Sequence, residues 1–239
     1  MAAQLLIYER AVPVSQQRHH NWSVKVGTDC AFARHVNSVP LLVSEFQAAA
    51  HEYVIVFAGT EKDIMPSVIL GMRDRENLYL SDTGEWNARY SPAFIRRYPF
   101  VFATDNEGET FTMYIDEGHT GCNQEGLGER LFDDAGKQTP YLDNVLEFLK
   151  AYQVQFQQTQ VFCNRLGELD ILEPMQVEFA PETGDKVSLS GFMVINRDKL
   201  KGLSGDKLAE LARTDELELM YLHLQSMRNI SQIANRMSV

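Results

Sequence analysis

A short stretch near the middle of the chain, residues 116–122, combines side chains that acid–base and nucleophilic catalysis use. Asp116 offers a carboxylate, His119 an imidazole and Cys122 a thiol. A cysteine nucleophile needs a nearby base, and His119 is close enough in sequence to approach Cys122 within a turn. Their spacing matches no established catalytic signature, so we prefer polar turn residues with an incidental cysteine. An enzyme of unknown reaction type with a site at Asp116–Cys122 is the alternative.

A second distinctive group lies in residues 85–100, where two arginines stand among aromatic residues and prolines. Arginine pairs with carboxylates through two parallel hydrogen bonds and stacks on aromatic rings. The structural interpretation ties an arginine to internal acids, such as those of residues 74–76, and places the aromatic rings in the core. The functional interpretation is a surface that binds an anion or a peptide. The residues of that surface would be Trp86, Tyr90, Arg96, Arg97 and Tyr98.

Linear motifs for metals, phosphates and hydrolase nucleophiles are missing from the sequence. The histidines show neither the His-Glu-x-x-His spacing nor a His-x-Asp pair, and no Cys-x-x-Cys pair exists. The adjacent residues His19 and His20 are expected on the surface. Gly126 and Gly128 lack the third glycine and the strand–helix context of a dinucleotide site. We predict no metal site and no cofactor, although many active sites have no linear motif.

The first two-thirds of the chain, which must position these groups, has the pattern of strands and turns with one early helix. Alanine-rich residues 44–51 predict the helix, and the apolar run at 53–58 predicts a buried strand. A further apolar segment follows at 67–72. Two hairpins are expected, one at 77–86 with its turn at 82–84, and one formed by 98–103 and 110–115 with a loop at 105–108. Residues 131–136 are apolar at first and end in one more turn. Glycines in these turns supply the backbone conformation that other residues disfavour.

A long helix is predicted from Thr139, a good N-cap, and Pro140, which is tolerated at the first helical position. Its expected length is about 25 residues, ending at Leu166-Gly167. One face is apolar: Leu142, Val145, Leu146, Leu149, Tyr152, Phe156 and Cys163. The outer face is rich in glutamine, which favours a solvated surface over a polar docking surface.

The last third predicts two strands followed by helices. The strands are 175–179 and 187–195, with a turn at 182–185. Ser204 should cap a helix to Ala212, and Thr214 should cap another running towards Met237. The apolar, methionine-bearing stripe of this last helix is interpreted as core, with a groove for a partner as the alternative. The fold class is therefore α+β, mostly antiparallel sheet with hairpins, one long central helix and a helical C-terminus. We expect one domain over 1–239, with candidate sub-boundaries near 138 and 167.

The composition limits the kinds of partner. The 239-residue chain carries a net charge of −11 and no basic run, so nucleic acid is not expected as a partner. The longest apolar run, Tyr53 to Ala58, is far shorter than a membrane span. Cys30, Cys122 and Cys163 are widely spaced and odd in number, which favours reduced thiols. With no signal peptide evident, we expect a soluble, cytoplasmic protein, and surface association stays open. The sequence does not indicate the oligomeric state.

Several segments, in order over nearly the whole chain, resemble the SapC-like family. They are Val68–Arg73, Glu76–Tyr79, Trp86, Tyr90–Phe100, Tyr114–Glu117, Leu131–Asp133 with Gly136, Ser190–Phe192 and Tyr221–Ser226. The Arg-Arg-Tyr-Pro-Phe block makes the resemblance specific. Tyr79 and Met72 stand where the family usually has Phe and Leu, and both changes conserve volume.

The resemblance implies a bacterial protein whose family name refers to a surface layer. It also leads to a permease label, which this sequence contradicts because it lacks a spanning segment. Relatives tend to be encoded near outer-membrane receptors, halogenase-like flavoproteins and cupin-like dioxygenases, which suggests an accessory role by analogy. No catalytic residues carry over. We therefore predict a non-catalytic binding or accessory protein that acts with a protein partner. The alternatives are the enzyme described above and a surface-layer component.

Overall fold

The computed structural model describes residues 6–25, 27, 29–60, 63–104, 111–179 and 186–237. Its largest sheet has five antiparallel strands in the order β10-β11-β4-β5-β3. These strands are β3 (Ser38–Pro40), β4 (Val54–Ala58), β5 (Met65–Ile69), β10 (Leu172–Phe179) and β11 (Val187–Ile195). Together with the helices below, this arrangement confirms the predicted α+β class and the mainly antiparallel pairing.

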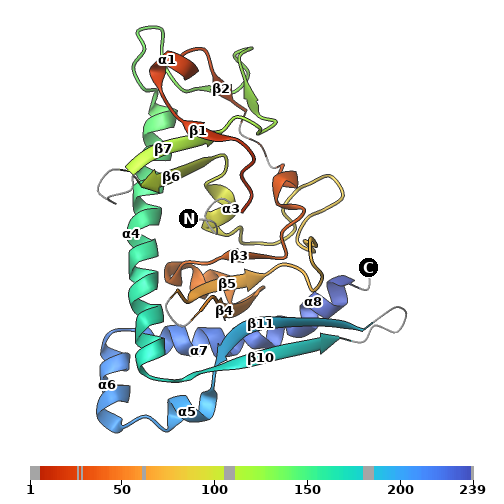
Figure 1. Cartoon of the computed structure of the whole chain (residues 1–239), viewed down its shortest axis with the longest axis vertical. Coiled ribbons are helices and arrows are strands. Elements are labelled where there is room, and N and C mark those ends of the chain that lie inside the picture. The colour runs from red at the N-terminus through yellow and green to blue at the C-terminus, as the bar shows by residue number, and fades with distance from the viewer. Residues whose placement is uncertain are drawn as a thin grey trace.

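Two smaller sheets lie at the other end of the molecule (Figure 1). One has the order β1-β7-β6, from β1 (Ala11–Pro13), β6 (Phe100–Thr104) and β7 (Phe111–Asp116). The other has the order β8-β2-β9, from β2 (Ser23–Val24), β8 (Cys122–Asn123) and β9 (Glu129–Arg130). β6 and β7 form the antiparallel pair expected from the sequence, whereas the connecting loop at 105–108 lies outside the described residues.

The long helix α4 (Pro140–Glu168) runs along both sheet regions in Figure 1. Thr139 caps it, because its side chain accepts a 3.4 Å hydrogen bond from the backbone of Leu142, and Pro140 is its first residue, as predicted. Leu142 and Leu149 pack into the core of the β1-β7-β6 sheet, while Phe162 and Leu166 pack into the core of the five-stranded sheet. One helix therefore joins the two halves. The single domain expected from the sequence, with candidate sub-boundaries near 138 and 167, stays a prediction.

The helical elements of the described chain are mostly short. They are α1 (Gln16–His19), η2 (Ala31–Ala33), η3 (Val43–Glu45), α2 (Phe46–Ala49), α3 (Ala93–Arg96), α5 (Arg197–Lys201), α6 (Gly205–Arg213), α7 (Glu216–Ser226), η4 (Met227–Asn229) and α8 (Ile230–Met237). The early helix expected at 44–51 is the pair η3 and α2. Ser204 caps α6 as predicted, accepting a hydrogen bond from the backbone of Lys207.

The single helix predicted from Thr214 towards Met237 was wrong in two respects. Its first residue is Glu216, preceded by Asp215 in the left-handed region with φ 60°. It is also interrupted after Ser226 by η4. Polar contacts explain the interruption: Ser226 accepts a hydrogen bond from the backbone of Ile55, and Asn229 donates to the carbonyl oxygens of residues 50 and 53. Sequence periodicity does not register such long-range hydrogen bonds.

Three other expectations had different outcomes. The apolar stripe of the last helices packs into the cores, as the core interpretation predicted, with Met220 fully buried. The hairpin expected at 77–86 is only a turn closed by one bridge between Leu80 and Trp86. β10 and β11 pair as predicted, but their turn at 182–185 lies outside the described residues.

Within the described ranges, no helix has the length and apolar character needed to cross a bilayer.

Candidate binding cleft

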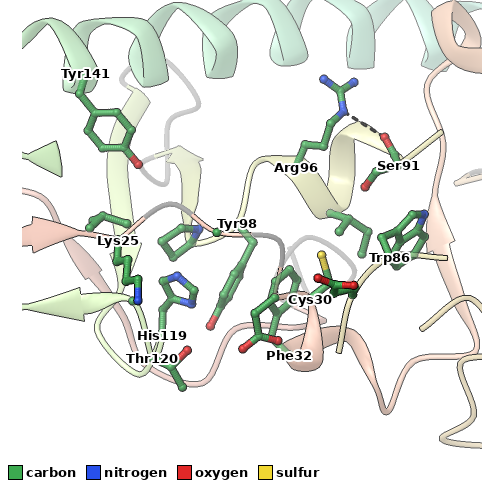
Figure 2. Close-up of a pocket in the computed structure, with 17 residues that line it drawn as sticks. Lys25, Cys30, Phe32, Trp86, Ser91, Arg96, Tyr98, His119, Thr120 and Tyr141 are labelled. Carbon is green, nitrogen blue, oxygen red and sulfur yellow. Dashed lines mark hydrogen bonds between the residues drawn. The ribbon is translucent and has the colours of Figure 1, made fainter. Parts of the chain in front are cut away.

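A cleft of about 780 Å³ lies where segments from four parts of the chain meet. Its lining residues are Val24, Lys25, Gly27, Asp29, Cys30, Phe32, Glu85, Trp86, Ser91, Ile95, Arg96, Tyr98, Pro99, His119, Thr120, Gly121 and Tyr141. Figure 2 shows Lys25 and His119 towards one side, Trp86 and Arg96 towards the other, and Tyr98 with Phe32 between them. The volume is typical of ligand sites in proteins. The two groups of residues that the sequence presents as alternatives both contribute to this cleft.

Arg96 projects from α3 and is held in place by its neighbours. Its Nε donates a 3.0 Å hydrogen bond to the carbonyl oxygen of Ser91, drawn in Figure 2. Its Nη2 donates a 3.3 Å hydrogen bond to the hydroxyl of Tyr90. The guanidinium carbon lies 5.7 Å from the ring centre of Tyr90 and 5.5 Å from that of Phe148. Within the described part of the chain, Arg96 has no carboxylate partner.

Arg97, the next residue, is buried, with 3% of its surface exposed. Its guanidinium carbon lies 4.3 Å from the ring centre of Phe94 and 4.8 Å from that of Tyr152. Arg97 therefore follows the structural interpretation of the arginine pair, since it packs among core rings. Of the acids in residues 74–76, Glu76 forms an ion pair with the nearby Arg73 at 2.8 Å.

Glu45 is a buried carboxylate that the sequence did not single out. It accepts hydrogen bonds from the backbone of Leu42 at 2.8 Å, the hydroxyl of Tyr90 at 2.6 Å and the backbone of Ala93 at 2.7 Å. Burial and the neighbouring Glu45 carboxylate raise the pKa of Tyr90 to about 12, so the phenol keeps its proton. Tyr90 thus donates to Glu45 and accepts from Arg96, which links the buried acid to the exposed cation.

Trp86 and Tyr98 form much of the aromatic lining. The indole nitrogen of Trp86 donates to the hydroxyl of Tyr53 at 2.9 Å, so the polar edge of this ring is used inside the protein. The ring of Tyr98 stacks on Phe32 with 3.9 Å between centres and meets the edge of His119 at 5.1 Å. These contacts leave half-buried aromatic surface on the cleft wall.

Asp116 lies fully buried beneath this wall. Its carboxylate accepts hydrogen bonds from the backbone of Glu9 at 2.8 Å, Arg10 at 3.0 Å and Gly118 at 2.9 Å, and from the hydroxyl of Tyr98 at 3.3 Å. A carboxylate with four donors has little capacity left to act on a ligand. Asp116 is therefore a positioning residue for Tyr98 and for the turn that follows β7.

His119 lines the cleft, whereas Cys122 is half-buried and does not belong to the lining. Burial, with the nearby carboxylates of Asp116 and Glu117, raises the pKa of Cys122 to about 12. Its thiol donates a 3.6 Å hydrogen bond to the carbonyl oxygen of Asp116. Burial also lowers the pKa of His119, so the imidazole is neutral at neutral pH. The arrangement therefore holds a protonated thiol rather than a thiolate.

His19 corrects the expectation that both adjacent histidines lie on the surface. It is fully buried at the end of α1, and its Nε2 lies 3.4 Å from Glu117, whereas His20 is half-buried. Arg18 also binds Glu117, and the hydrogen bond from this guanidinium lowers the pKa of Glu117. Both residues lie at the C-terminal end of α1, where the His19 side chain is buried.

The lining residues that had no signal in the sequence include Lys25, Asp29, Cys30, Phe32 and Tyr141. Four of them belong to one loop and the 3-10 turn η2, and the fifth is on the first turn of α4. Only the tertiary fold brings them to the segment 85–99. The cleft holds two cations, Lys25 and Arg96, and two acids, Asp29 and Glu85, so it has no strong net charge.

The fold and the cleft define a class: an α+β protein with an aromatic-lined cleft spanned by one long helix. Comparison with protein families gives the more specific assignment. The family SapC matches residues 14–233, nearly the whole chain, and the protein belongs to that family. Comparisons with curated proteins and with solved structures gave no match.

Proposed function

We propose that this protein is a non-catalytic binding module that acts with a protein partner, and that the cleft holds a segment of that partner. The observation that carries the proposal is the combination of a cleft of about 780 Å³ with Arg96, a fixed cation that has no carboxylate partner among the described residues. The proposal includes three further expectations: no cofactor, no nucleic-acid partner and a cytoplasmic location.

The chemistry of the wall supports binding over catalysis. The raised pKa of Cys122 keeps its thiol protonated, and Cys122 is not among the lining residues of the cleft. Asp116 uses its oxygens on four donors of the protein itself. Aromatic rings and arginine, by contrast, are the side chains that interfaces favour.

The dimensions of the cleft also suit a polypeptide segment. An extended chain advances about 3.3 Å per residue, so a cleft of this volume accommodates a few residues. Apolar side chains would contact Phe32 and Trp86, and main-chain groups would meet the polar side chains of Ser91 and Thr120.

Site-directed cross-linking in native cells tests the proposal. A photoreactive amino acid would replace Thr120 or Ser91, which line the cleft, and Gln160, which is exposed on α4, in a matched control. We expect one stoichiometric adduct with a protein from the two cleft positions. An adduct of equal yield from Gln160 would favour the glutamine-rich face as the docking surface. Absence of adducts from both cleft positions contradicts the proposal.

One observation keeps an enzyme as the second candidate. His119 places a neutral imidazole on the cleft wall, where it could accept a proton from a bound molecule. A metabolite that copurifies with the protein and is converted by the wild type but not by His119→Ala would favour this candidate. The surface-layer alternative would need recovery of the protein from the cell surface or its assembly into sheets.

A further inference from the structure

Arg96 has the properties of a recognition residue within the cleft, and this role rests on the proposed function. We propose that Arg96 binds a carboxylate of the bound segment, and that the segment carries an apolar or aromatic side chain beside this carboxylate. Three features support this role: the restrained position of Arg96, the absence of a carboxylate partner among the described residues and the character of the neighbouring lining.

The guanidinium group is already ordered before any ligand arrives. Two hydrogen bonds, to the carbonyl oxygen of Ser91 and to the hydroxyl of Tyr90, fix its orientation, and the rings of Tyr90 and Phe148 flank it. An arginine side chain normally loses considerable rotamer freedom on binding. Because Arg96 has lost most of that freedom in the folded protein, a ligand would bind it at a smaller entropic cost.

The fixed orientation leaves the binding edge of the guanidinium available. Arginine has five N–H groups, and the hydrogen bonds of the described structure use one on Nε and one on Nη2. Nη1 therefore keeps both of its N–H groups and Nη2 keeps one. Free N–H groups of a guanidinium can bind both oxygens of a carboxylate at once.

The charge of Arg96 is not neutralised by its supporting residues. Tyr90 accepts from Arg96 while donating its proton to Glu45, so the Glu45 carboxylate is separated from the guanidinium by the phenol. Two other exposed arginines pair directly with a carboxylate, Arg18 with Glu117 and Arg130 with Asp134, and neither lines the cleft. The guanidinium of Arg96 is thus oriented by the protein, but none of the described residues supplies a carboxylate that pairs with it.

The surroundings of Arg96 determine what accompanies the carboxylate. Trp86 lies on the same side of the cleft as Arg96 in Figure 2, and Ile95 also lines the cleft, so an apolar or aromatic group would be buried beside the ion pair. Asp29 and Glu85 also line the cleft, and they would repel a second carboxylate. The chemistry therefore favours a peptide with one acidic group over a polyanion. That group is either an acidic side chain or a C-terminal carboxylate.

Selection from displayed peptides tests this inference with the full chain. One library would present random heptapeptides internally, and a second would present them with a free C-terminus. The targets would be the wild type, Arg96→Gln, and Arg89→Gln as a matched control. Arg89 is also an exposed arginine, but it lies outside this cleft and pairs with Glu52 at 3.9 Å.

The expected result is enrichment of peptides with a carboxylate next to an aromatic or apolar residue, on the wild type and on Arg89→Gln but not on Arg96→Gln. Enrichment of Asp or Glu in the internal library identifies a side chain as the source. Enrichment only in the free C-terminal library identifies the main-chain carboxylate. Both outcomes support the inference.

Synthetic peptides then measure the effect. Replacing the selected carboxylate by its amide should weaken binding to the wild type about ten-fold or more, because a bond to a charged group is lost. The same replacement should have little effect on Arg96→Gln, and Arg96→Lys should restore only part of the preference because lysine lacks the planar fork. Thermal unfolding would verify that each variant is folded.

Selection without a carboxylate, a preference that persists in Arg96→Gln, or failure to select any peptide would overturn the inference. The proposed function would survive each of these results if cross-linking from Thr120 and Ser91 still captured a partner. Conversely, loss of cross-linking would contradict the proposed function. Peptide selection therefore tests the role of Arg96, and cross-linking independently tests the proposed function.

Discussion

The hydroxyl of Tyr98 lies 3.3 Å from Oδ2 of Asp116 and donates a hydrogen bond to it. This bond connects the aromatic wall of the cleft to the buried end of β7. Burial, together with the adjacent Asp116 carboxylate, raises the pKa of Tyr98, so the phenol remains a donor at all physiological pH values. The position of the ring against Phe32 and His119 thus depends on a carboxylate that does not itself line the cleft.

Removal of the Asp116 carboxylate should therefore destabilise the protein strongly. Asp116→Ala leaves three backbone N–H groups and the Tyr98 hydroxyl without their acceptor. Each buried unpaired donor costs about 1–3 kcal/mol, so we expect a loss of about 3 kcal/mol or more in the free energy of unfolding. Urea unfolding followed by circular dichroism measures this. Asp116→Asn keeps one acceptor oxygen and should lose less; equal stability of Asp116→Ala and wild type contradicts the positioning role.

Substitution of Glu45 should disturb Arg96 from a distance. Glu45→Gln replaces one acceptor oxygen by an NH₂ group that faces the donors of Leu42, Tyr90 or Ala93. We expect a loss of about 1–3 kcal/mol in unfolding free energy, together with weaker binding of the peptides selected above. Glu147→Gln on the exposed face of α4 serves as the control. Unchanged peptide affinity in a folded Glu45→Gln protein would show that Tyr90 positions Arg96 without help from Glu45.

His223 should make stability dependent on pH. It is fully buried, neither ring nitrogen has a partner in the described structure, and burial lowers its pKa to about 3. The unfolded chain binds this proton near pH 6.5, whereas the folded protein binds it only near pH 3. Stability contributed by the neutral ring is therefore present above pH 6.5 and falls with decreasing pH between these values, by about 1.4 kcal/mol per pH unit.

His223→Leu tests that assignment because leucine does not titrate. Urea unfolding between pH 7 and pH 4 should show the wild type losing stability relative to the variant as the pH falls, since the variant lacks this loss. His51→Gln, at an exposed position, should behave as the wild type. Parallel curves for wild type and His223→Leu would contradict the depressed pKa.

Cys122 should be unreactive in the folded protein. A pKa of about 12 leaves so little thiolate at pH 8 that alkylation by iodoacetamide should be roughly a thousand-fold slower than in the unfolded chain. Mass spectrometry of time-quenched samples, with urea-unfolded protein as the reference, measures the rate at each cysteine. Rapid native alkylation of Cys122 would reveal a thiolate and would restore the segment 116–122 as a catalytic candidate.

Local signals in the sequence predicted elements well where the elements are defined by neighbours along the chain. Thr139 and Pro140 indicated the start of α4, and the apolar run at 53–58 indicated β4, because capping and strand burial depend on adjacent residues. The turn η4 escaped prediction because Ser226 and Asn229 bind backbone that lies more than 170 positions away.

The candidate site was predictable only in part for the same reason. The arginine block stood out by composition, but successive residues on a helix point about 100° apart, so Arg96 faces the cleft while Arg97 enters the core. Glu45 reaches Tyr90 across 45 positions, and Lys25 and Arg96 line opposite sides of one cleft although they are far apart in the sequence. No local pattern encodes such pairs.

The helix α4 has a mechanical consequence for the cleft. Tyr141 lines one wall, and Phe148 supports Arg96 at another, seven positions further along the same helix. Two turns of α-helix advance roughly 10.5 Å and resist compression, because every backbone hydrogen bond along them would have to change. The distance between these two positions of the cleft wall should therefore be the same with and without a bound segment. Partners should then be selected by how well they fit a cleft of fixed width.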